Sequence, residues 1–247
     1  IGVSPLFAQQ GVTQCGTPTG QPKFPIETYQ ELPDPSSPSD KDWAAVTNPQ
    51  ISWGTIDTRY AKHRLPQLKK QQLTTLKGWR GERINAQAVV WTGTEVKDLN
   101  FSFTDFKDKK GNSLSDEAFK AGFIRYVMTD ELNKDGRGAC GHRQAVDYDS
   151  LLVADPIDTN LKSMSVPART VQPIWVQCWI PQSATPGTYK GALLIKDGSR
   201  LLQQLNLEIL VSSRELPAPS EWAYHLDLWQ SRSEERRVGK ECRSRWS

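Results

Sequence analysis

The sequence lacks any run of about 18 apolar residues, the length that a membrane-spanning helix needs, so we expect no membrane span. It has no pair of CxxC motifs at zinc-site spacing, no phosphate-binding glycine loop and no Ser/His/Asp arrangement. A convincing pair of catalytic carboxylates is also missing. We therefore expect this chain to carry no catalytic residue, no metal and no cofactor.

Basic residues are not in excess once the segment from Arg232 to Ser247 is set aside. That segment reads RSEERRVGKECRSRWS and resembles a translated sequencing adapter, so we expect residues 232–247 to be non-native; a natural basic tail is the alternative. It holds six of the 31 basic and three of the 28 acidic residues, which leaves 25 of each. A neutral remainder argues against a nucleic-acid partner.

Cysteine is scarce, and its count does not suggest a disulfide framework. Without Cys242 of the adapter-like segment, Cys15, Cys140 and Cys178 remain, and three is an odd number. A Cys140–Cys178 bridge would require an oxidising compartment. The favoured interpretation is that Cys178 is an unpaired thiol and a small residue of the core.

The N-terminal residues suggest export. Residues 1–8 (IGVSPLFA) resemble the end of the apolar region of a signal peptide with its cleavage site, although an ordinary N-terminus would look similar. We expect an exported protein, periplasmic or extracellular. Residues 9–41 are rich in Pro, Ser, Thr and Gly and are predicted to be a flexible lead-in.

Residues 42–214 show the period-two alternation of strands that are covered on one face, and they predict one all-β domain, an antiparallel β-sandwich with immunoglobulin- or fibronectin-like layering. The apolar positions of the clearest runs are Ile84, Ala86, Ala88 and Val90; Ile174, Val176, Cys178 and Ile180; Tyr189, Gly191, Leu193 and Ile195; and Leu205, Leu207, Ile209 and Val211. Helix-like stretches are confined to Ala61–Leu76, which Pro66 interrupts, and Ser115–Ala121.

Two turn signals support this fold. Asp197-Gly198 lies between two alternating runs and predicts a hairpin. Tyr189 follows the turn at Pro186-Gly187, as in a tyrosine corner, where the hydroxyl bonds back to nearby backbone.

Two polar segments inside the domain are candidate sites. Cys140, His142, Asp147 and Asp149 have metal-ligand chemistry, but a glycine-rich loop with Asp-capped turns explains them better. The segment from Gly78 to Arg83 (GWRGER) is expected to form ion pairs at a strand start or a domain seam. Its Trp79 would pack in a core or interface, or less favourably stack on a sugar ring.

A new element follows the domain. Residues 215–231 combine a proline-rich linker with the run WAYHLDLW, in which alternation puts His225, Asp227 and Trp229 on one face. That polar face opposite an apolar one suits an inner barrel strand, so we predict that these three residues bind substrate. A buried structural polar cluster is the alternative.

Four runs together resemble the N-terminal region of family 123-like glycoside hydrolases. They are GWRGERINAQAVVWT, RYVMTDE, VQPIWVQCWIPQSATPGTYKGALLI and LPAPSEWAYHLDLWQ. The resemblance implies a β-sandwich ahead of a (β/α)8 barrel, with LDLWQ as the first strand of a truncated barrel. It also implies an enzyme that removes terminal N-acetylgalactosamine, with the substrate's acetamido group as the nucleophile. An Asp–Glu pair beyond Gln230 would position that group and supply the general acid/base.

The favoured hypothesis is thus a non-catalytic N-terminal domain of an exported glycoside hydrolase. Its partners would be the barrel against which the sandwich packs and, through that barrel, a glycan substrate. The alternative is a stand-alone carbohydrate-binding or adhesive module, which would present a linear row of exposed aromatic side chains.

Overall fold

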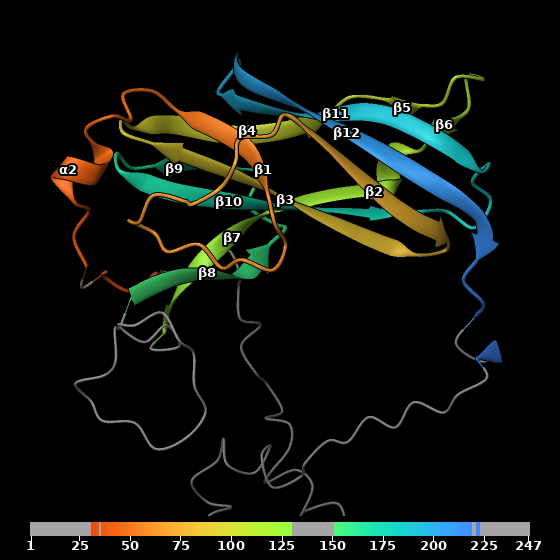
Figure 1. Ribbon diagram of the computed structural model, residues 1–247, viewed down its shortest axis with the longest axis horizontal. Coiled ribbons are helices and arrows are strands. Elements are labelled where there is room, and N and C mark those ends of the chain that lie inside the picture. The colour runs from red at the N-terminus through yellow and green to blue at the C-terminus, as the bar shows by residue number, and fades with distance from the viewer. Residues whose placement is uncertain (1–30, 35, 130–150, 219–220, 223–247) are drawn as a thin grey trace, which may run out of the picture. The chain divides into compact units, whose positions relative to one another are not determined.

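The computed structural model describes residues 31–34, 36–129, 151–218 and 221–222, and strands dominate this part of the chain (Figure 1). Its helical elements are one turn of α-helix, α2 (Asp40–Trp43), and a 3-10 turn, η2 (Asp116–Ala118). Within these ranges no helix is long and apolar enough to cross a membrane. The prediction of an all-β fold is confirmed.

The strands form two sheets that pack face to face. The five-stranded sheet has the order β1 (Gln50–Gly54), β3 (Arg83–Thr92), β10 (Thr170–Trp179), β7 (Phe119–Thr129) and β8 (Leu151–Asp158). The seven-stranded sheet has the order β2 (Leu73–Arg80), β12 (Arg200–Glu215), β11 (Gly187–Asp197), β4 (Val96–Phe103) and β9 (Ser163–Val166), with β5 (Phe106–Lys107) beside β11 and β6 (Ser113–Leu114) beside β5.

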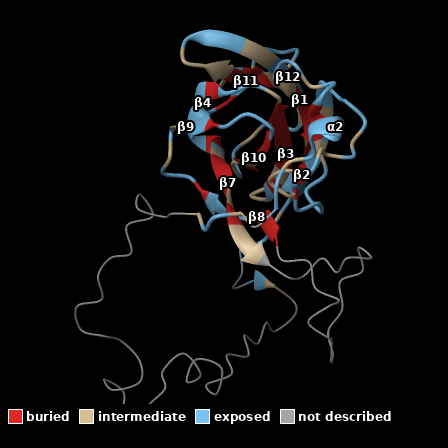
Figure 2. Ribbon diagram, turned by 90° about the vertical axis from the view of Figure 1, so that its left-hand side faces the viewer, coloured by how far each residue is buried: buried red, intermediate tan, exposed pale blue. Residues whose placement is uncertain are grey.

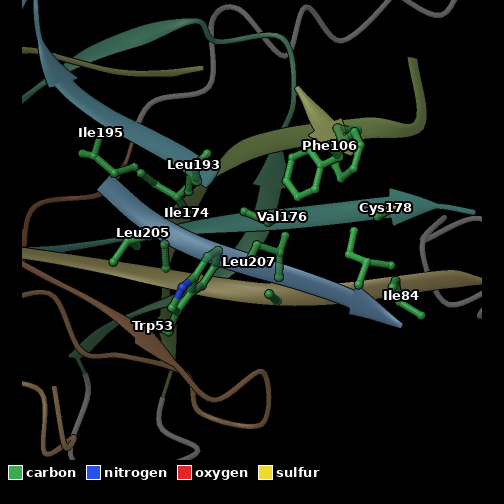
Figure 3. Packing of buried hydrophobic residues seen from close by; sticks show 14 of the residues in the cluster. Trp53, Ile84, Phe106, Ile174, Val176, Cys178, Leu193, Ile195, Leu205 and Leu207 are labelled. Carbon is green, nitrogen blue, oxygen red and sulfur yellow. The ribbon is translucent and has the colours of Figure 1, made fainter. Parts of the chain in front are cut away.

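The core lies between the two sheets because alternate residues of each strand point inward. In β12, Leu205, Leu207 and Ile209 are fully buried, and Asn206 between them is exposed. Ile174 and the other inward residues of β10 meet them from the five-stranded sheet (Figure 3). Figure 2 shows this buried layer between the two sheets. The predicted two-layer sandwich is therefore confirmed.

Trp53 connects the two sheets directly. It lies on the edge strand β1, is 3% exposed, and points into the core beside Leu205 and Leu207 (Figure 3). Its indole N–H donates a hydrogen bond of 2.8 Å to the main-chain carbonyl of Asn206 in the opposite sheet. The polar edge of a buried tryptophan is thus satisfied by the facing backbone.

The prediction that all strands are antiparallel is wrong for one pair. β2 runs parallel to β12, with Leu73 beside Asn206 and Lys77 beside Leu210. After β1 the chain crosses from the five-stranded to the seven-stranded sheet over residues 55–72, and it enters β2 in the direction of β12. Such a crossover permits parallel pairing, which a tight hairpin does not.

The helix-like pattern of Ala61–Leu76 does not form a helix. Ala61 makes a β-bridge with Val153, and the N–H of Lys62 donates to the carbonyl of Leu152. Pro66 interrupts the segment and lacks a backbone donor, and Leu73 already begins strand β2. Of the second stretch, Ser115–Ala121, only the short turn η2 is helical before β7 begins at Phe119.

β3 is covered on both faces, although its alternation suggested one covered face. Its inner side chains face the core, and Val89 and Trp91 on the outer face are also buried. They pack with Trp43, Tyr60 and Val171 in a second apolar cluster. The segment before β2 supplies part of this cluster and adds a third layer over this strand.

Both turn predictions are confirmed. β11 and β12 are joined by the two-residue loop Gly198-Ser199, in which Gly198 has φ +60°. Positive φ at the first loop position is typical of a type II′ hairpin turn, where glycine avoids the strain of a side chain. The hydroxyl of the buried Tyr189 donates 2.7 Å to the carbonyl of Thr185, as a tyrosine corner requires.

Candidate functional site

The turn between β2 and β3 crosses from the seven-stranded to the five-stranded sheet at the end of the sandwich where β12 also finishes (Figure 1). Gly81 lies in this turn with φ +86°, a conformation that glycine adopts without steric cost. Its N–H donates 2.8 Å to the carbonyl of Ile180, which fixes the turn to the five-stranded sheet. The GWRGER segment is therefore a rigid corner between the two sheets.

Arg80 ties this corner to the last residues of the domain. Its Nη2 lies 3.0 Å from Oε2 of Glu215, and its Nη1 donates 3.1 Å to the carbonyl of Gln182. The N–H of Leu216 donates 2.8 Å to the carbonyl of Arg80. The ion pair expected in this segment is present. Because both side chains are partly exposed, it contributes at most about 1 kcal/mol, and the backbone bond sets the direction in which the chain leaves.

A groove lies beside this corner on the seven-stranded sheet. Its volume is about 640 Å³, within the range of small-molecule sites. We call it the Trp79 groove, and its lining residues are Lys77, Gly78, Trp79, Glu82, Gly187, Thr188, Leu210, Val211 and Ser212.

Strand pairing explains the composition of the groove. Lys77 pairs with Leu210, which pairs with Thr188 on the next strand, so the three side chains share the outer face of the sheet. The next pair is Gly78 with Val211. Gly78 must remain small, because a Cβ there would lie only 2.7–2.8 Å from side-chain atoms of the core.

Trp79 is the aromatic wall of the groove. It is 39% exposed, and the guanidinium of Arg214 lies 5.6 Å from its ring centroid. Its backbone N–H donates 2.7 Å to Oε2 of Glu82, so that carboxylate is turned toward the backbone of the β2–β3 turn. The other exposed tryptophan of the described residues, Trp179, lies on the five-stranded sheet, where Arg83 stacks 4.6 Å from its ring.

A second, basic depression of about 370 Å³ shares Gly187 and Thr188 with the Trp79 groove. Its remaining lining residues are Asp108, Lys109, Lys110, Pro186 and Lys190. The carboxylate of Asp108 accepts hydrogen bonds from the Asn112 amide and from the N–H groups of Asn112 and Lys110. These bonds, the Asn112 side chain first, lower the pKa of Asp108 and hold it ionised.

A comparison with known protein families identifies the family of this domain. Residues 53–197 match the family described as the glycoside hydrolase 123 N-terminal domain. The chain belongs to this family. The match covers the two sheets from Trp53 to the end of β11, including Trp79 and Thr188 of the groove.

One solved structure supports this fold. A family 123 glycoside hydrolase from Clostridium perfringens is similar with a TM-score of 0.58 and 19% identity, over 70% of this chain and 29% of that chain. The present glycoside hydrolase 123 N-terminal domain therefore spans less than a third of that protein. A PapD-like domain of human CEP192 is a more distant match, with a TM-score of 0.33 and 10% identity over 77% of this chain and 98% of that one. No curated protein sequence matches.

The residues predicted to bind substrate, His225, Asp227 and Trp229, lie outside the described residues and stay a prediction. The same holds for the Cys140–Asp149 segment. Cys178 is a free thiol buried in the core, as expected, and burial raises its pKa to about 12, so it is not a nucleophile at neutral pH. Among the described residues no group of three or more His, Cys, Asp and Glu could hold a metal ion.

A partly buried ionic network was not predicted from the sequence. Glu31 accepts from Lys62 at 2.6 Å and from Arg125 at 3.1 Å, and Arg125 also lies 3.5 Å from Asp158. Burial raises the pKa of Glu31, but the hydrogen bonds and charges of Lys62 and Arg125 outweigh it, so the pKa lies below 4.5. The partners lie far apart along the chain, and no local motif identifies them. The network attaches Glu31 to the five-stranded sheet.

Proposed function

We propose that this domain is the non-catalytic N-terminal β-sandwich of an exported glycoside hydrolase. The full-length enzyme removes terminal N-acetylhexosamine residues. Membership of the family supports the enzyme context. The similar solved protein from Clostridium perfringens is described as hydrolysing glycolipid glycans. The activity on N-acetylhexosamine and the substrate-assisted mechanism come from the resemblance to family 123 enzymes, and export comes from the N-terminal residues.

The observation that carries the proposal is the fixed corner at Arg80. The carbonyl of Arg80 receives the N–H of Leu216, and its side chain pairs with Glu215, so the chain leaves the sandwich in a set direction. Trp179 is 54% exposed at the same end. A rigid end with an exposed aromatic side chain is suited to packing against a following domain. We assign Trp179 and Arg83 to the interface with the catalytic barrel.

The first test is enzymatic. This chain, purified to homogeneity, should show no turnover of an aryl N-acetylgalactosaminide, whereas a longer natural form that includes the barrel should hydrolyse it. Turnover by this chain alone would contradict the assignment as a non-catalytic domain. Inactivity of the longer form on aryl hexosaminides generally would contradict the proposed substrate class.

The second test addresses the interface. In the longer form, Trp179→Ser should increase protease cleavage within residues 213–218 and lower the unfolding temperature. Leu201→Ser is the matched control, because Leu201 is 51% exposed beside the β11–β12 hairpin, at the other end of β12. Equal effects of the two substitutions would show that Trp179 is not part of the interface with the barrel.

A stand-alone carbohydrate-binding module is the second candidate, and the half-exposed Trp79 at a groove favours it. It would require a linear row of exposed aromatic residues. Within the described ranges, the exposed tryptophans Trp79 and Trp179 lie on different sheets and form no such row. The accessory-domain proposal is therefore preferred.

A further inference from the structure

The Trp79 groove and the adjoining basic depression form one continuous surface feature. They meet at Gly187 and Thr188, and both lie along the same sheet, where β2, β12, β11 and β5 are neighbours (Figure 1). From Lys77 across Leu210 to Thr188 the surface spans two strand spacings, about 10 Å. This length accommodates a short oligosaccharide segment.

Lysines outnumber carboxylates in the lining of this surface, four against the two of Glu82 and Asp108. Four lysines line it, and only Lys190 is paired, with Glu208 at 2.6 Å. Among the described residues, Lys77, Lys109 and Lys110 form no ion pair, although the charge of Lys110 contributes to lowering the pKa of Asp108. These three ammonium groups outnumber the two carboxylates of the lining and leave a modest excess of positive charge.

The two carboxylates in the lining, Glu82 and Asp108, offset part of this positive charge. Glu82 accepts the backbone N–H of Trp79, and both oxygens of Asp108 accept hydrogen bonds from Asn112. Among the described residues neither carboxylate forms an ion pair with Lys77, Lys109 or Lys110, so the three ammonium groups remain available to an external anion. Hydrogen bonds between an ammonium group and an anionic oxygen are stronger than those between neutral groups.

Trp79 adds a second kind of contact. Its flat ring forms the apolar wall, and the electron-rich face of an indole attracts the weakly positive C–H groups on one face of a pyranose ring. The Arg214 guanidinium lies over the ring at 5.6 Å and adds a further positive charge. Thr188 and Ser212 also line the groove and carry hydroxyl groups suited to sugar hydroxyls.

We propose that the Trp79 groove and the adjoining depression together bind an acidic oligosaccharide, with a pyranose ring against Trp79 and with separate carboxylate or sulfate groups on Lys77 at one end and on Lys109 and Lys110 at the other. This site would hold a glycan on the sandwich itself, apart from any catalytic centre. It does not depend on the proposed hydrolase activity, because either an accessory domain or a stand-alone module can use it.

The experiment measures binding of this chain to four probes by calorimetry at low ionic strength. The probes are an oligogalacturonate, a chondroitin sulfate oligosaccharide, a neutral cello-oligosaccharide and a single-stranded oligonucleotide. Binding of either acidic glycan with at least tenfold preference over the neutral glycan and the oligonucleotide is expected. The two acidic probes distinguish a carboxylate requirement from a sulfate requirement.

Variants then locate the site. Trp79→Ala and the triple variant Lys77→Gln, Lys109→Gln, Lys110→Gln should each weaken binding at least tenfold, while unchanged thermal transitions show that they remain folded. The matched controls are Trp179→Ala and Lys120→Gln, both exposed on the other sheet, and they should change affinity less than twofold. Raising the salt concentration should weaken acidic-glycan binding in the original chain but not in the triple variant.

Three results would overturn the proposal. They are absence of acidic-glycan binding, equal binding of the oligonucleotide, and loss of binding in the lysine variant with full binding in Trp79→Ala. The last two would indicate adsorption of any polyanion. None of these results affects the hydrolase assay, so failure of this inference and failure of the proposed function are distinguishable.

Discussion

Replacing Trp53 by phenylalanine tests whether the link between the two sheets stabilises the domain. Phenylalanine keeps most of the apolar contact but removes the indole N–H that donates 2.8 Å to the carbonyl of Asn206. Loss of the donor leaves that acceptor without this partner, which costs about 1–2 kcal/mol. For a domain of this size, each kcal/mol lowers the unfolding temperature by about 2–4 °C.

Trp53→Ala should be more severe. The side chain is 3% exposed and packs among core residues of both sheets, so truncation leaves a cavity and costs about 3–5 kcal/mol. Thermal unfolding followed by circular dichroism, with urea unfolding for the free energies, measures both variants. Trp79→Phe is the matched control, because a 39% exposed ring outside the core should change stability by about 0.5 kcal/mol or less.

The reasoning fails if Trp53→Phe unfolds at the same temperature as the original chain. It also fails if Trp53→Phe and Trp79→Phe are equally destabilised. Burial and the cross-sheet hydrogen bond of Trp53 would then make no measurable contribution to the free energy of unfolding. A loss in Trp53→Ala with none in Trp53→Phe would show that packing alone, without the hydrogen bond, accounts for the role of Trp53.

Two further predictions concern the ionic network and the core. The pKa of Glu31 is lowered in the folded state, so its contribution to stability is present above pH 4.5 and is lost as the pH falls through the folded pKa. The difference in unfolding free energy between the original chain and Glu31→Gln should therefore shrink on acidification. A difference that stays constant with pH would contradict this. Gly191→Ala should lower the free energy of unfolding by about 1–3 kcal/mol, because the added Cβ would lie 2.6–2.7 Å from ring carbons of Phe106. Gly187→Ala is the control: the nearest atom to its Cβ would be 3.5 Å away, so urea unfolding should show almost no change.

The fold class could be read from local patterns. Strands that bury one face must alternate apolar and polar residues, and β11 and β12 do so. Turn chemistry is also local, so Gly198 and Tyr189 indicated the hairpin and the tyrosine corner. Cys178 was correctly assigned to the core on the same grounds.

The errors arose where long-range packing overrides local pattern. Ala61–Leu76 has helix-like spacing, but it forms backbone hydrogen bonds with strands from distant parts of the sequence. Val89 and Trp91 are covered by residues that precede β2 in the chain, which alternation in β3 cannot reveal. The parallel direction of β2 against β12 depends on a crossover between sheets, and strand patterns carry no sign of direction.

The candidate site divides in the same way. The sequence by itself singled out the GWRGER segment and its ion pairs, because charges beside a glycine turn are a local feature. Only the tertiary structure decided that Trp79 shares a groove with Thr188 and that this groove adjoins the depression lined by Lys109 and Lys110, since these residues come from different strands and loops. Local residue types determine which face of a strand is buried; pairing between distant strands determines which exposed side chains become neighbours.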